Sequence, residues 1–312
     1  MAVLAIDSGG SKTHIRISDN TGNMLYESYC AGIGKAVDNK CEELPEFKND
    51  VSDSVKRSGL NYEDIKAVVV NLGGKNIVQT ENNLRGIFPL CPIRVYRESS
   101  SEVSIQFGKE AKASAVLLAG TGSICIAFNE NTVYTAGGWG QDIGDDGSGY
   151  WIGLEAVRRS LMELDDVKPL SMLAQTITGQ QTPLSAEKEP EVLMEKRDNV
   201  RTMLNPRTRS HIASYSKSVC QCAENGDAVA IEILNKAGYL LAELAVKTIK
   251  KVFSEQPGHL IISGGLINCI TFWEDAFKNH FNANLENWEF SCKKNGLIEG
   301  TTQLALNLLK EN

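Results

Sequence analysis

The chain has 312 residues and a formal net charge of −7 at pH 7, with 42% hydrophobic and 23% charged residues. This is the balance of a folded globular protein, and the length predicts two domains. The acidic excess leaves no overall cationic field, so we expect neither nucleic acid nor a membrane surface as a partner.

At the start of the chain, a short apolar run from Met1 to Ile6 reaches Asp7 at once. The run is too short for the apolar region of a signal peptide, and no later stretch approaches the roughly 18 apolar residues of a membrane span. We therefore expect a cytoplasmic protein. The eight cysteines are scattered through a chain too large to need disulfides, and we interpret them as reduced core thiols.

The first hundred residues predict a sheet that begins with a meander. Alternating apolar residues and turn chemistry favour strands over Ala2 to Ile6, Thr13 to Ser18 and Met24 to Tyr29. Helical periodicity follows from Cys41 to Gly59, where the glycine is a stop signal. Buried strands, with crossover helices, are then predicted over Ala67 to Leu72 and Ile93 to Tyr96.

The same pattern of strand, glycine turn and strand starts again in the second half of the chain. Strands are predicted over Ala113 to Ala119, Ile124 to Asn129, Thr132 to Ala136 and His259 to Ser263. Asp227 is the expected cap of a long apolar helix that reaches Phe253, and Thr301 to Leu309 predicts a closing helix after Gly300. The proline-rich stretch from Lys168 to Pro206 is left open as helices or a mobile insert.

Three junctions between a strand and a turn combine glycine with serine or threonine. They are Asp7 to Thr13, Ala119 to Ser123, and Ser263 to Gly265. Phosphate chains are bound by backbone N–H groups and hydroxyls that can approach closely, and residues with little side-chain bulk allow this. Any one of the three could be a plain hairpin turn, but together they favour a phosphate site. Neither a P-loop nor a dinucleotide fingerprint matches the spacing.

The first junction resembles the first phosphate loop of the BadF/BadG/BcrA/BcrD ATPase family, in the actin/hexokinase/Hsp70 superfamily. The second resembles the family's second phosphate loop, and the third its adenosine motif. The resemblance runs the length of the chain and implies that ATP contacts these turns. The residues so implied are Gly9, Gly10, Ser11, Lys12, Thr13, Gly120, Thr121, Gly122, Ser123, Gly264 and Gly265.

The resemblance also implies an α/β fold of two RNase-H-like domains with a central cleft. We expect one domain over residues 1–110, joined by the C-terminal helix 299–312, and the other over residues 111–298. ATP and Mg²⁺ would bind on one side of the cleft and a small sugar at its bottom. A homodimer is an open alternative to a monomer.

The run from Gly137 to Gly153 is similar to the sugar-binding segment of N-acetylglucosamine kinases within this family. The family's sugar contacts match Gly138, Trp139, Gly140, Gln141 and Asp145. The chemistry agrees, because an aromatic ring suits the apolar face of a sugar and a carboxylate accepts hydrogen bonds from its hydroxyls. A glycine-rich turn before a helix is the structural alternative. We expect phosphorylation of N-acetylglucosamine or a related hexosamine, at the 6-hydroxyl.

The expected catalytic residues are Glu98 and Asp7. In the family an aspartate follows the strand that here is Ile93 to Tyr96, and Glu98 stands at that position. Its extra methylene would move the carboxylate by roughly an ångström, a shift that can lower the rate about 10²-fold if nothing compensates. Asp7 is implied as the carboxylate that holds Mg²⁺, the alternative being a residue that stabilises the turn.

A second departure concerns the segment from Ala31 to Lys35, where the family has a sugar-contacting asparagine and this chain has none before Asn39. The substrate could therefore differ from N-acetylglucosamine. Three alternatives stay open: a family ATPase that serves an iron–sulfur cluster, a sugar or nucleotide binder with weak or no kinase activity, and Glu98 as a solvent-facing residue. For the first of these, Cys269 lacks a partner cysteine nearby in the sequence.

Overall fold

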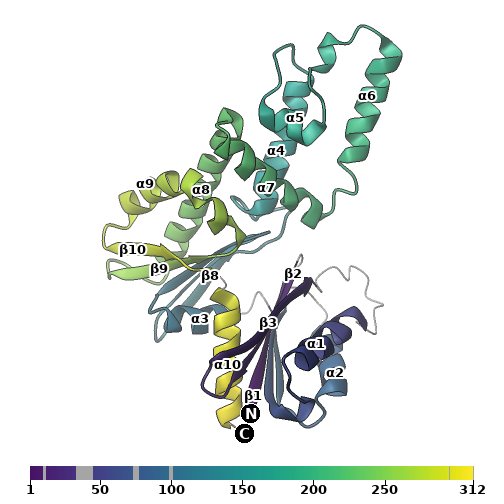
Figure 1. Ribbon diagram of the computed structural model, residues 1–312. Coiled ribbons are helices and arrows are strands. Elements are labelled where there is room, and N and C mark those ends of the chain that lie inside the picture. Colours follow the sequence, from purple (N-terminus) through teal and green to yellow (C-terminus); the bar gives the residue numbers. More distant parts are fainter. Residues whose placement is uncertain (10–11, 33–44, 73–76, 98–100, 295, 312) are drawn as a thin grey trace.

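The computed structural model describes residues 1–9, 12–32, 45–72, 77–97, 101–294 and 296–311. It contains two five-stranded sheets, each flanked by helices, as Figure 1 shows. The expected two-domain α/β fold is confirmed. None of the helices in the described ranges combines the length and apolarity needed to cross a bilayer.

The first sheet has the strand order β3-β2-β1-β4-β5. Its strands are β1 (Ala2–Ser8), β2 (Lys12–Asp19), β3 (Met24–Ala31), β4 (Ile65–Leu72) and β5 (Ile93–Arg97). β1 pairs antiparallel with β2 and parallel with β4, so the predicted meander and the later buried strands form one sheet. Its other elements are α1 (Pro45–Arg57), α2 (Ile77–Ile87) and the 3-10 turn η2 (Tyr62–Asp64).

The central strand β1 is buried on both faces. Leu4 and Ile6 pack in the same cluster as Phe47 of α1, on one face of the sheet. Val3 points to the other face and packs with Leu306 of α10 (Gly296–Glu311). Because successive side chains of a strand alternate between faces, the apolar side chains of β1 are divided between these two layers.

The second sheet repeats this topology with the order β10-β9-β6-β7-β8. Its strands are β6 (Ala115–Ala119), β7 (Ser123–Phe128), β8 (Val133–Gly137), β9 (Gly258–Ser263) and β10 (Trp288–Cys292). β6 pairs antiparallel with β7 and parallel with β9, as β1 does with β2 and β4. The repeat inferred from the sequence is therefore present in the fold.

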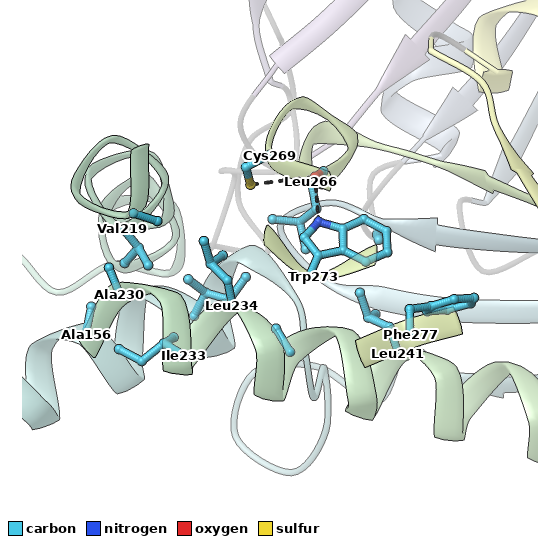
Figure 2. Packing of buried hydrophobic residues seen from close by; sticks show 14 of the residues in the cluster. Ala156, Val219, Ala230, Ile233, Leu234, Leu241, Leu266, Cys269, Trp273 and Phe277 are labelled. Atoms are coloured by element: carbon cyan, nitrogen blue, oxygen red, sulfur yellow. Dashed lines mark hydrogen bonds between the residues drawn. The ribbon is translucent and has the colours of Figure 1, made fainter. Parts of the chain in front are cut away.

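The second half also holds the larger core. Its elements are α4 (Gly149–Leu164), α5 (Met172–Thr178), η3 (Leu184–Ala186), α6 (Pro190–Met203), α7 (Arg209–Glu224), α8 (Ala228–Ile249), η4 (Gly265–Phe272) and α9 (Glu274–Asn284). Figure 2 shows Trp273 beside α8, where its indole N–H donates to the carbonyl oxygen of Leu266 at 3.0 Å. This bond anchors η4, the segment that directly follows the third glycine turn.

The structure decides one alternative that the sequence left open and changes two interpretations. The stretch from Lys168 to Pro206 contains α5 and α6, which Figure 1 shows at the far end of the second half. The closing helix begins at Gly296, and Gly300 lies inside it because its bare Cα packs against Phe107. Cys220 and Cys269 are joined in a disulfide, so the interpretation of all cysteines as reduced is wrong.

Two helices link the halves. α10 covers the first sheet, while α3 (Ser101–Glu110) inserts Phe107 into a cluster with Val116 and Ile126 of the second sheet. Gly296 of α10 also packs against Phe107. The division at residues 110 and 111 stays a prediction, and by packing α3 belongs with the second sheet.

Candidate functional site

The turn from Gly120 to Ser123 joins β6 to β7 and is fixed by the start of α4. Gly120 N donates to the carbonyl oxygen of Gly122 at 2.9 Å, which closes the turn. The first amides of α4 point back at it, with Gly149 N donating to Gly120 O at 2.8 Å and Tyr150 N to Thr121 O at 3.1 Å. The turn therefore has one defined position against the helix.

The turn at Gly264 lies beside this one because β6 and β9 are parallel neighbours. Gly264 has a φ of +117°, and a Cβ there would collide with the backbone of Ala119. Only glycine allows both this conformation and this close approach. Two of the three glycine junctions predicted from the sequence thus meet at one end of the second sheet.

The segment that follows β8 returns to the same place. Gly138 N donates to the carbonyl oxygen of Ser123 at 2.8 Å, and Gly137, Gly138 and Gly140 all have positive φ. These bends carry Trp139 to the surface, where 75% of it is exposed. A large exposed aromatic ring beside a polar turn is suited to stacking on a ligand.

Asp145 is buried and links the segment after β8 to the turn Gly120 to Ser123 by hydrogen bonds. It is only 3% exposed and has a φ of +60°, which is unusual for a residue with a side chain. Its Oδ1 accepts from Ser123 N at 3.3 Å, and its Oδ2 accepts from Arg209 Nη2 at 2.7 Å. Ser123 Oγ in turn donates to the carbonyl oxygen of Asp146 at 2.9 Å.

The first sheet contributes Asp7 at the carboxyl end of β1. Asn71, its partner in the parallel strand β4, donates through Nδ2 to Asp7 Oδ1 at 2.8 Å. Burial raises the pKa of Asp7 to about 6, although the hydrogen bond from Asn71 and the charge of Lys12 lower it. The other amide atom, Asn71 Oδ1, is buried and has no hydrogen-bond partner among the described residues.

This pair fits a hard cation. Carboxylate and amide oxygens are the protein ligands that Mg²⁺ takes, usually one or two together with phosphates and water. A buried carboxylate and an unsatisfied amide oxygen both gain from a positive charge placed between them. Nowhere in the described ranges do three or more His, Cys, Asp or Glu residues gather in a cluster that could hold a metal by itself.

The β1–β2 hairpin carries the rest of the first junction. Gly9 N donates to the carbonyl oxygen of Lys12 at 3.0 Å, and the hydroxyls of Ser8 and Thr13 are hydrogen-bonded at 2.7 Å. Lys12 Nζ lies 4.5 Å from the centre of the Tyr29 ring. Figure 1 shows β2 beginning at the end of the first sheet that is nearer the second half.

Some predicted residues lie elsewhere. Gln141 lines a depression of about 200 Å³ between its own segment, which contributes Asp146, and α4, which contributes Trp151 and Arg158. Gly10, Ser11 and Glu98 lie outside the described residues, as does the segment from Ile33 to Asn39.

Two residues of this site, Arg209 and Asn71, were not predicted from the sequence. Arg209 follows a stretch without a motif and meets Asp145, which is 64 residues away in the chain. Asn71 could have been identified from the sequence, because it is the one polar side chain in the predicted buried strand Ala67 to Leu72.

Comparison with known proteins identifies relatives over the full length. The chain is 27% identical over 314 residues to an N-acetylmuramic acid/N-acetylglucosamine kinase of Clostridium acetobutylicum, with 97% of each chain covered. It is 26% identical to an N-acetyl-D-glucosamine kinase of Dictyostelium discoideum, with 98% of each covered. The fold matches the solved structure of a protein described as an N-acetylglucosamine kinase from Porphyromonas gingivalis, with a TM-score of 0.66 at 16% identity and 98% and 99% of the two chains covered.

The sequence profile of one family matches residues 4–288, which include all three glycine junctions, Asp145 and Arg209. The resemblance read from the phosphate loops is thereby confirmed. The chain belongs to the BadF/BadG/BcrA/BcrD ATPase family.

Proposed function

We propose that this chain is an ATP-dependent kinase that phosphorylates an amino sugar, N-acetylglucosamine or a related hexosamine, at its 6-hydroxyl. One observation carries the proposal: the turns at Gly120 to Ser123 and at Gly264 meet the segment with Trp139 and Asp145 at one end of the second sheet. Two full-length relatives named as kinases of N-acetylglucosamine support the choice of substrate.

The nucleotide would be held mainly by backbone groups. A Cβ at Gly120 or at Gly265 would meet nothing within 4 Å, so phosphate oxygens could approach the backbone of both turns there, and the Thr121 hydroxyl adds a side-chain group. The hairpin with Gly9 and Lys12 would contact the phosphates from the first sheet. Asp7 and Asn71 would hold Mg²⁺, which when bound to phosphates supplies positive charge that offsets theirs.

The sugar would lie between Trp139 and Asp145. The exposed indole offers an apolar face to the ring, and the carboxylate accepts hydrogen bonds from hydroxyls. Each carboxylate oxygen has two lone-pair sites, so the bonds of Asp145 to Ser123 and Arg209 leave acceptor capacity; because its side chain is only 1% exposed, a sugar hydroxyl would reach it through movement of the surrounding side chains.

In the reaction, the sugar hydroxyl oxygen forms a bond to the γ-phosphorus while the bond from that phosphorus to the β,γ-bridging oxygen breaks. ADP leaves with the electron pair of the broken bond, and the hydroxyl proton passes to a carboxylate. We propose Glu98 as that base, from its position after β5. The protein otherwise acts by aligning the two substrates and by excluding water.

The experiment is an assay of ADP release with Mg²⁺, ATP and a panel of amino sugars, followed by mass analysis of the product. We expect one sugar phosphate for each ADP with N-acetylglucosamine or a close relative, and none with its 6-deoxy analogue. Glu98→Gln should lower kcat by about 10²–10⁴-fold. ATP hydrolysis without a phosphorylated sugar would contradict the proposal, and normal turnover by Glu98→Gln would remove the role of that residue.

A further inference from the structure

Arg209 is the first residue of α7 and belongs to none of the predicted motifs. Thr208 caps the helix by accepting from His211 N at 3.3 Å, and this fixes the point from which the Arg209 side chain leaves. Its guanidinium donates to the Oδ2 of Asp145 at 2.7 Å. The Arg209 side chain is 45% exposed while that of Asp145 is 1% exposed, so the pair has one buried end and one open end.

The guanidinium also lies against the second phosphate turn. A Cβ added to Gly122 would be 2.5 Å from Arg209 Nη2 and 2.8 Å from Asp145 Oδ1. Glycine at position 122 therefore leaves the space that the guanidinium occupies. Because Ser123 N donates to the same carboxylate, the turn, Asp145 and Arg209 form one unit drawn from three separate parts of the chain.

This unit is neutral overall, but its open side presents the guanidinium, whose remaining N–H groups suit an anion. A guanidinium has five N–H donors, and one hydrogen bond to Asp145 leaves several for a further acceptor. Phosphate oxygens match this planar set of donors well. A triphosphate at the turn would bring several negative charges close to Asp145, and Arg209, which lies against both Asp145 and Gly122, would be the nearby cation.

We propose that Arg209 binds the terminal phosphate of ATP and offsets the charge that develops on it during transfer, while Asp145 holds the guanidinium in position. This inference rests on the proposed function. In phosphoryl transfer the charge spreads over the equatorial oxygens of the γ-phosphate, and an arginine directed at them can contribute about 10³–10⁵-fold to kcat. Arg209 is thus a catalytic residue and Asp145 a positioning residue for it.

Two other roles predict different results. If Arg209 only neutralises a buried carboxylate, its loss lowers stability and leaves nucleotide discrimination unchanged. If it recognises a carboxylate on the sugar, its loss affects sugars with a carboxylate, such as N-acetylmuramic acid, and spares N-acetylglucosamine. The position of the guanidinium against Gly122 favours the phosphate.

The test compares Arg209→Met with Arg209→Lys and with Arg201→Met. Arg201 lies on α6, is 62% exposed and pairs only at the surface with Asp198, which makes it a matched control. Affinities for ADP and for a non-hydrolysable ATP analogue are measured by calorimetry with Mg²⁺, and kcat and KM are measured with both sugars.

We expect Arg209→Met to bind the ATP analogue about tenfold or more weakly than the wild type does, and to bind ADP within about threefold of the wild type. Its kcat should fall at least about 10³-fold with both N-acetylglucosamine and N-acetylmuramic acid. Arg209→Lys should recover part of kcat, because lysine restores the charge without the fork of donors. Arg201→Met should match the wild type.

Removal of Arg209 alone leaves a buried carboxylate unpaired, so the double variant Arg209→Met with Asp145→Asn is measured as well. This double variant removes the unpaired charge and should therefore fold. Its affinity for the ATP analogue should still be lowered more than its affinity for ADP. Equal losses for both nucleotides, a loss confined to the carboxylate-bearing sugar, or a lower melting temperature with normal kinetics would each overturn the inference. A wild-type chain that phosphorylates no sugar would overturn the proposed function as well, whereas an active wild type with an unchanged Arg209→Met variant would overturn only the inference.

Discussion

Replacement of Gly122 by alanine perturbs the centre of the site with a single methyl group. The new Cβ would lie 2.5 Å from Arg209 Nη2 and 2.8 Å from Asp145 Oδ1. Non-bonded heavy atoms prefer separations of about 3.5 Å or more, so the ion pair must move by about 1 Å. A displacement of this size next to the reacting groups can lower kcat/KM by about 10²-fold, equivalent to about 2.7 kcal/mol.

The effect of Gly122→Ala on stability should be smaller than its effect on the rate. Overpacking usually lowers the free energy of unfolding by about 1–3 kcal/mol. The partly exposed Arg209 side chain can swing away but the buried Asp145 carboxylate must shift, so we expect about 1–2 kcal/mol. For domains of this size, about 1 kcal/mol corresponds to a fall of about 2–4 °C in Tm.

Steady-state kinetics and thermal melting on the same preparations test this prediction. Gly120→Ala is a control for stability, because a Cβ at Gly120 would meet nothing within 4 Å. Its Tm should stay within a few degrees of the wild type. If Gly122→Ala keeps the kcat/KM of the wild type, the ion pair against the turn has no part in catalysis and the reasoning fails.

Three further substitutions test separate parts of the site. Asp7→Asn should lower Mg²⁺-dependent turnover by at least about 10²-fold. Its circular dichroism and Tm should stay as in the wild type, because the amide removes a buried charge without changing the shape of the side chain. A normal rate at saturating Mg·ATP would contradict the role of Asp7 in metal binding. Gly264→Ala should lower the free energy of unfolding by at least about 1–3 kcal/mol in denaturant titration, because its φ of +117° is strained and its Cβ would collide with Ala119. Gly265→Ala, where a Cβ meets nothing within 4 Å, is the control, and equal stability of the two variants would refute the packing argument. Trp139→Ala should leave Tm unchanged, because Trp139 is 75% exposed. It should raise the KM for the sugar by up to about tenfold, and an unchanged KM would exclude stacking of Trp139 on the sugar.

The strands around the site could be predicted because their physical signal is local. β1, β6 and β9 are each a short apolar run that ends at a small or polar residue, and β4 carries the run Ala67 to Val70 before Asn71; such runs need burial on both faces. The glycine junctions could be predicted for the same reason, since positions such as Gly264 tolerate no side chain.

The contacts between distant segments could not be predicted in this way. The bond from Arg209 to Asp145, the disulfide from Cys220 to Cys269 and the start of α10 at Gly296 each depend on how helices pack, and no local pattern encodes that packing. Asp145 was expected as a sugar ligand from the resemblance, but its burial against Ser123 emerged only from the fold.

A crystal structure with Mg²⁺, a non-hydrolysable ATP analogue and N-acetylglucosamine tests the central claim most directly. We expect one triphosphate in contact with Thr121 and Gly264 from the second half and, through the metal, with Asp7 from the first. Its terminal phosphate should be directed at a sugar bound beside Trp139. A nucleotide bound away from these turns, or a sugar in an unconnected region, would contradict the claim.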